Sequence, residues 1–113
     1  MIVTLFGGLA LAPGMEGEES RLSAELREAA RQHPGFISIK HYRADDGEQV
    51  GIIRFSSREA LDDWMRHEGH LRAQKAEPPI YQSFWIQSAE TFREYRVDGS
   101  DRVEGDLTDL FSR

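Results

Sequence analysis

The chain has 113 residues, which is enough for one domain with a single hydrophobic core and too few for two. Hydrophobic residues make up 39% and charged residues 30% of the sequence, a composition typical of globular proteins rather than disordered, fibrous or membrane-embedded ones. Twenty acidic residues against fourteen lysines and arginines give a net charge of -6, which argues against nucleic acids and anionic membranes as partners, because both attract clustered cations.

The first predicted elements are a strand, a helix and a hairpin. Residues 2–10 are rich in β-branched and apolar side chains and precede Pro13-Gly14, which favours a strand. Residues 15–32 have apolar side chains at three- and four-residue spacing, which predicts an amphipathic helix. Residues 36–42 and 49–55 are extended runs joined by a turn that contains Asp46-Gly47, so they form a predicted hairpin.

A second helix and a last strand follow the hairpin. Ser56 and Glu59 have the spacing of a capping box, so we expect a helix that begins at Ser56 and is interrupted at Gly69. Further helical turns are expected over residues 70–76, and a strand over residues 80–87. The order β-α-β-β-α-β predicts an α+β, ferredoxin-like subunit, with an antiparallel sheet and both helices on one of its faces.

We expect one domain over residues 1–97 and an acidic tail over residues 98–113. The tail carries five acidic residues and two arginines, and so contributes -3 to the net charge. Leu107, Leu110 and Phe111 have helical spacing within it, so both a short docked helix and a frayed terminus are open interpretations.

Both faces of the predicted sheet carry apolar side chains. Alternate residues of a strand point to opposite faces, so Val3, Leu5 and Leu9 oppose Ile2 and Phe6. The same holds for Val50 and Ile52 against Ile53 and Phe55, and for Phe84 and Ile86 against Tyr81 and Trp85. Because two helices cover only one face, we expect the other face to be buried against a second copy of the chain in a homodimer.

Several classes of chemistry lack the residues they require. The chain contains no cysteine, which excludes disulfides, thiolate metal sites, iron–sulfur clusters and cysteine nucleophiles. The motifs of nucleotide-binding loops and serine hydrolases are absent as well. The uncharged stretch over residues 1–15 is shorter than the roughly 20 residues of a membrane-spanning helix and lacks a basic start, so we expect a cytoplasmic protein.

The most distinctive cluster runs from Trp64 to His70 and also contains His67. The spacing of the two histidines falls one residue short of the H-E-x-x-H zinc motif, and no third ligand is well placed, so we expect no metal. Solvent-facing or capping histidines, and a histidine that lines a pocket as a general base, are the remaining interpretations. Trp64 shares a helical face with Ala60 and Leu61, so it belongs to the core, where it can also form the wall of an aromatic-ligand pocket.

The sequence resembles the antibiotic biosynthesis monooxygenase (ABM) family of dimeric α/β barrels. The resemblance covers about residues 1–95 and is carried by Asp46-Gly47, Phe55-Ser56-Ser57, Glu59-Ala60-Leu61, Trp64, His67, His70 and Tyr81. It implies a ferredoxin-like subunit whose sheet packs face to face against that of a second copy. It also implies a pocket between the sheet and the helices for a planar, polyphenol- or quinone-like molecule.

Family enzymes of this kind oxygenate phenolic substrates with O2 and without metal or flavin, because the deprotonated substrate itself supplies the electrons. The resemblance therefore implies a cofactor-independent monooxygenase or quinone-modifying oxidoreductase, with no bound cofactor. Such chemistry requires a dry aromatic pocket, a base and a donor for the developing oxyanion. The implied base is His70 or His67, and the implied donor is Tyr81. Trp85 should face the same way as Tyr81, and His41 points toward an apolar layer. The expected substrate contacts are therefore Trp64, Phe6, Trp85 and His41.

The same fold can carry two other functions. A haem-degrading branch of the superfamily uses an Asn on the first strand and a His about ten residues after the helical Trp, but Gly7 and Gln74 stand at those positions and the chain has no Asn at all. Haem degradation is therefore disfavoured. A non-catalytic ligand-binding or stress-response module of the same fold is the alternative that fold similarity leaves open.

Overall fold

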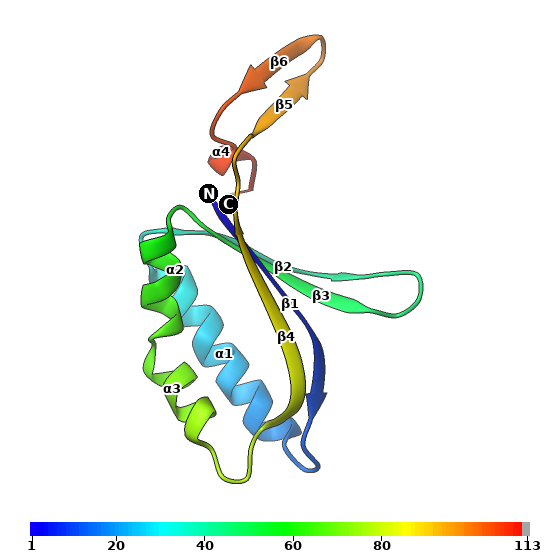
Figure 1. Ribbon diagram of the computed structural model, residues 1–113, viewed down its shortest axis with the longest axis vertical. Helices are drawn as coiled ribbons and strands as arrows, with labels where there is room; N and C mark the ends of the chain where they lie inside the picture. Colours follow the sequence, from blue (N-terminus) through cyan, green and yellow to red (C-terminus); the bar gives the residue numbers. More distant parts are fainter. Residues whose placement is uncertain (112–113) are drawn as a thin grey trace.

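The computed structural model describes residues 1–111 and has the predicted α+β, ferredoxin-like architecture. The elements are β1 (Ile2–Leu11), α1 (Glu16–Gln32), β2 (Phe36–Arg43), β3 (Gln49–Phe55), α2 (Arg58–Met65), α3 (Glu68–Lys75), β4 (Tyr81–Glu90), β5 (Tyr95–Asp98), β6 (Asp101–Glu104) and α4 (Thr108–Phe111). The first four strands form an antiparallel sheet in the order β2-β3-β1-β4, with α1, α2 and α3 on one face (Figure 1). Among residues 1–111, no helix is long and apolar enough to cross a bilayer.

The core lies between the sheet and the first two helices. Its buried side chains come from β1, β3, α1 and α2, and they are Ile2, Ala30, Ile53, Phe55, Ala60 and Leu61. Phe6 and Trp64 are only partly buried and pack against this core. The core therefore fills one end of the space beneath the helices and leaves aromatic side chains at its border.

The second helical region starts one residue later and breaks two residues earlier than expected. Ser57, rather than Ser56, caps α2, since its hydroxyl accepts a hydrogen bond from the amide of Ala60 at 3.1 Å. The break falls at residues 66–67, and Gly69 lies inside α3. A Cβ atom at Gly69 would lie 3.0 Å from Leu26 Cδ2, so the glycine permits the close approach of α3 to α1.

An irregularity in β1 changes which side chains face the helices. Gly8 has a φ of 63°, in the left-handed region that glycine tolerates, and the pairing of β1 with β4 shifts between Gly7 and Leu11. As a result Leu9 lies on the helix side of the sheet with Phe6, where it lines a cavity. Strict alternation placed Leu9 on the opposite face, and that prediction is wrong.

The same shift separates Tyr81 from Trp85, which were expected to face the same way. Tyr81 pairs with Leu11, beyond the irregularity, and lies on the helix side. Trp85 pairs with Gly7, and its ring lies so close to that residue that a Cβ atom there would be 2.7 Å from Trp85 Cζ2. Tyr81 and Trp85 therefore lie on opposite faces of the sheet.

The face opposite the helices carries a row of half-buried apolar side chains. Its members on the three strands β1, β3 and β4 are Val3, Leu5, Val50, Ile52 and Trp85. At one end of this face the guanidinium of Arg54 stacks on the ring of Phe111 in α4, 3.7 Å from its centroid. Of the helices in the described part of the chain, α4 is the one that reaches this face.

The C-terminal segment forms a separate hairpin. Strands β5 and β6 pair with each other in a two-stranded sheet that projects beyond the main sheet (Figure 1). The boundary that we expected between residues 97 and 98 falls within β5, and residues 112–113 of the expected tail lie outside the described residues. This projecting hairpin lengthens the molecule along its longest axis, and the overall dimensions are 53 × 34 × 22 Å (Figure 1).

Candidate functional site

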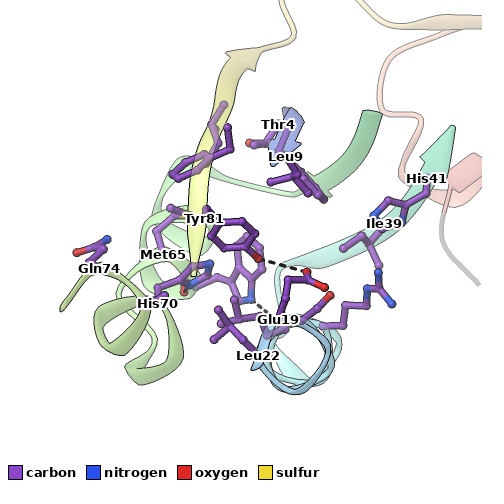
Figure 2. Close-up of a pocket in the computed structure, with 18 residues that line it drawn as sticks. Thr4, Leu9, Glu19, Leu22, Ile39, His41, Met65, His70, Gln74 and Tyr81 are labelled. Carbon is purple, nitrogen blue, oxygen red and sulfur yellow. Dashed lines mark hydrogen bonds between the residues drawn. The ribbon is translucent and has the colours of Figure 1, made fainter. Parts of the chain in front are cut away.

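A cavity of about 360 Å³ lies between the helix side of the sheet and helices α1, α2 and α3 (Figure 2). Its volume is within the range of small-molecule sites, which are mostly apolar with a few polar groups. The apolar part of the wall comes from β1, α1, β2 and β4, with Phe6, Leu9, Leu22, Ile39, Phe84 and Ile86. Polar and charged side chains also line the cavity, among them Glu19, Arg27, His41, His70 and Tyr81.

Trp64 forms the inner wall of the cavity and also belongs to the core. Its indole Nε1 donates a hydrogen bond to the carbonyl of Leu26 at 2.9 Å, which ties α2 to α1. Its ring packs on Phe55, with 5.7 Å between the centroids. One side of the indole is thus fixed by the core, and the residue still lines the cavity.

His70 lies in the same wall and is held in one tautomer. Its Nδ1 lies 2.9 Å from the carbonyl oxygen of Trp64, which can only accept a hydrogen bond, so Nδ1 carries the proton and Nε2 has a free lone pair. Its ring stands perpendicular to the indole of Trp64, with centroids 4.5 Å apart. Burial lowers the pKa of His70 below the ordinary 6.5, which keeps the imidazole neutral at pH 7.

Tyr81 and Glu19 form a polar pair at the cavity (Figure 2). The Tyr81 hydroxyl donates a hydrogen bond to a carboxylate oxygen of Glu19 at 3.3 Å. Burial and the neighbouring carboxylate raise the pKa of Tyr81 to about 12, because both disfavour the phenolate. Tyr81 therefore stays protonated, and its hydroxyl hydrogen bond is directed to Glu19.

Phe6 and His41 also line the cavity, as expected from the sequence. Their rings meet edge to face with centroids 5.7 Å apart. The Phe6 ring lies over Gly51 of β3, where a Cβ atom would be 2.1 Å from Phe6 Cζ. Gly51 is thus a residue that sequence reasoning missed, and the space above it positions Phe6.

His67 and Trp85 do not line the cavity, although both were expected at the site. The Nδ1 of His67 accepts a hydrogen bond from the amide of Gly69 at 2.9 Å, so its imidazole caps the start of α3. Trp85 pairs with Gly7, before the register shift, and lies on the opposite face of the sheet. The structure brings together His70, Tyr81, Trp64, Phe6 and His41 and leaves these two residues outside.

Sequence reasoning also missed Glu19 and Arg27, the two charged side chains of α1 at the cavity. They share a helical stripe with Leu22, Ser23 and Leu26, which line the cavity too. The sequence did contain a signal for Glu19 and Arg27, because both charged residues fall on the apolar stripe of an amphipathic helix. Within residues 1–111, no three His, Asp or Glu side chains lie close enough together to bind a metal.

Comparison with known proteins gives a sequence match and several structural ones. The sequence profile of the family described as antibiotic biosynthesis monooxygenase matches residues 3–76. No curated protein matches the chain in sequence. The fold is similar to that of Rv0793 from Mycobacterium tuberculosis, with a TM-score of 0.62, 20% sequence identity, and coverage of 83% of this chain and 98% of that one.

Two further solved structures share the fold. A Deinococcus radiodurans protein assigned to the antibiotic biosynthesis monooxygenases has a TM-score of 0.66 and 15% identity, and the match covers 88% of this chain and 100% of that one. A variant of SnoaB from Streptomyces nogalater, described as a cofactor-independent oxygenase, has a TM-score of 0.58 and 16% identity, with coverage of 82% and 95%. At these identities the structural similarity establishes the fold, and the sequence match carries the family.

Proposed function

Because this chain belongs to the antibiotic biosynthesis monooxygenase family, we propose that its cavity binds an aromatic, phenol- or quinone-like molecule and oxygenates it with O2 without a bound cofactor. The fold that it shares with SnoaB, a cofactor-independent oxygenase, supports the proposal. The single observation that carries it is His70, a neutral imidazole with a fixed tautomer in a cavity wall rich in aromatic side chains.

The reaction needs no electron donor besides the substrate. A phenol with a hydrogen on the carbon opposite the hydroxyl reacts with one O2 to give a quinone and one water, since one oxygen atom enters the ring and the other leaves as water. The first step is removal of the phenolic proton, because the phenolate gives up electrons to O2 far more readily than the phenol. The protein must therefore supply a base and exclude water.

His70 is the base in this proposal. Its Nε2 lone pair accepts the phenolic proton, and the resulting imidazolium is stabilised by the hydrogen bond from Nδ1 to the Trp64 carbonyl. Trp64 and Phe6 hold the rings of the substrate by aromatic contact. Tyr81, which stays protonated, donates a hydrogen bond to a substrate oxygen once the substrate displaces it from Glu19.

The test is oxygen consumption with a panel of naphthols, hydroxyanthracenes and quinols under air. We expect at least one compound to consume O2 faster with the protein than without it, at one O2 per molecule of quinone formed. Saturable binding of the panel without turnover would favour the alternative, a non-catalytic ligand-binding module. Turnover that requires added metal or flavin would contradict the cofactor-independent mechanism.

A further inference from the structure

We propose that Arg27 binds an anionic group of the ligand, so that the cavity selects aromatic molecules that carry a negative charge, such as a carboxylate. The inference deepens the proposed function. It rests on one part of that function, namely that an aromatic molecule binds in this cavity. It does not depend on whether that molecule is oxygenated.

Arg27 lies where an amphipathic helix ordinarily places an apolar residue. It shares the cavity-facing stripe of α1 with Leu22 and Leu26, and its side chain is half-buried. Three other arginines, Arg21, Arg66 and Arg72, each lie within 4.0 Å of a carboxylate. No carboxylate of residues 1–111 lies that close to Arg27, so its charge has no protein counterion there.

An unpaired guanidinium in an apolar wall favours an anionic ligand. When a ligand fills the cavity, it removes water from around Arg27, and the desolvated charge is unfavourable unless the ligand supplies a partner. A carboxylate is a good partner, because guanidinium binds it through two parallel, charge-assisted hydrogen bonds. A neutral aromatic molecule of the same shape leaves the charge uncompensated.

The charges of the cavity are arranged so that an anion has one preferred end. Glu19 is the acidic residue in the wall, but it lies eight residues before Arg27, or about 12 Å along the helix axis. It also accepts the hydrogen bond of Tyr81. His41 faces the same cavity, where burial and the nearby Arg27 lower its pKa and the Glu19 carboxylate partly offsets them, so the guanidinium of Arg27 is the permanent positive charge of the wall.

This arrangement gives the ligand a direction. The anionic group lies at Arg27, and a phenolic hydroxyl lies toward Tyr81, Glu19 and His70. A carboxylate in the opposite direction would meet the carboxylate of Glu19. The cavity is thus suited to an aromatic molecule with an acid at one end and a hydroxyl at the other.

The test compares two probes of nearly equal shape, anthraquinone-2-carboxylate and 2-methylanthraquinone. Binding is followed by quenching of tryptophan fluorescence, since Trp64 lines the cavity. We expect the wild-type protein to bind the carboxylate about tenfold more tightly than the methyl compound. We expect Arg27→Gln to lose this preference and Arg27→Lys to keep part of it. Equal affinity of the wild-type protein for the two probes would overturn the inference.

Arg31→Gln is the matched control, since Arg31 is an exposed arginine one turn further along α1. It removes the same charge from the same helix, and we expect it to keep the wild-type preference. If Arg31→Gln lowered the preference as much as Arg27→Gln, the effect would come from net charge, and the assignment to Arg27 would be wrong. Oxygen uptake is a separate measurement, so charge selectivity without turnover would reject the proposed function and leave this inference standing.

Discussion

At the scale of single residues, the cavity gives two neighbouring histidines unlike roles. His67 lies in the break between α2 and α3, whereas His70 lies three residues further on, within α3. His70 turns to the cavity, and His67 uses its Nδ1 to cap α3. The pair offers an internal comparison of the proposed base with a structural imidazole.

We expect His70→Ala to lower turnover of a phenolic substrate about 100-fold or more, because a positioned general base contributes 10²–10⁴ in rate. Its stability should change little, since the half-buried ring contributes modest packing. His67→Ala should keep its turnover and lose about 1 kcal/mol of stability with the cap of α3. Turnover and urea denaturation of the two variants check this, and undiminished turnover of His70→Ala would refute the assignment of the base.

The lowered pKa of His70 predicts the pH dependence of activity. The neutral imidazole is the active form, so kcat/KM should be constant above pH 6.5 and fall as the pH drops through the lowered pKa of His70. The free energy of unfolding should fall over the same pH range. Below pH 6.5 the unfolded chain gains a proton on His70 that the folded state, with its lowered pKa, does not yet bind. Tyr81, with its pKa of about 12, should add no alkaline limb below that pH. A pH–rate profile with its acid limb above pH 6.5 would contradict this.

At the scale of elements, the side chain of Trp64 ties helix α2 to helix α1. Trp64 donates to the Leu26 carbonyl and packs on Phe55. We expect Trp64→Ala to cost about 3 to 5 kcal/mol of stability and to abolish ligand binding, as large-to-small changes at a core do. Trp64→Phe should keep most of the packing and lose about 1 kcal/mol with the hydrogen bond. Denaturation midpoints and probe binding measure the two effects.

The start of α2 depends on one serine rather than its neighbour. Ser57 accepts a hydrogen bond from the amide of Ala60, so Ser57→Ala should lower the free energy of unfolding by about 1 kcal/mol. Ser56→Ala is the control and should change it by less than about 0.5 kcal/mol, as surface substitutions usually do. If Ser56→Ala proved the more destabilising of the two in urea denaturation, the capping residue would be misassigned.

At the scale of the whole molecule, the sheet has one face beneath α1–α3 and one with a row of apolar side chains outside them. The second face carries Val3, Leu5, Val50, Ile52 and Trp85. Such a surface favours association, and a face-to-face dimer would bury it. A standard interface of this kind removes about 1,200–2,000 Å² of surface in total.

We expect sedimentation at micromolar concentration to give a dimer, with twice the mass of the 12.9 kDa chain. Ile52→Lys should give a folded monomer, because Ile52 lies on the outer face. Ile53→Lys should fail to fold, because Ile53 is fully buried in the core on the other face. A wild-type protein that sediments as a monomer would contradict the prediction of a dimer.

The sequence by itself determined the element order and, through it, the fold. Helical spacing in residues 15–32 and the turn at Asp46-Gly47 are local signals, since they depend on residues within a few positions of each other. The resemblance to the ABM family likewise predicted a cavity beneath the helices. It indicated four residues that line it, namely Trp64, His70, Tyr81 and Phe6, and strand alternation indicated a fifth, His41.

Only the tertiary structure decided which side chains meet in the cavity. The left-handed Gly8 and the register shift that follows it turn Leu9 and Tyr81 toward the helices and leave Trp85 outside. The helix break excludes His67, and the orientation of α1 brings in Glu19 and Arg27. These outcomes depend on contacts between strands and helices that are far apart in the sequence, and local periodicity carries no record of such contacts.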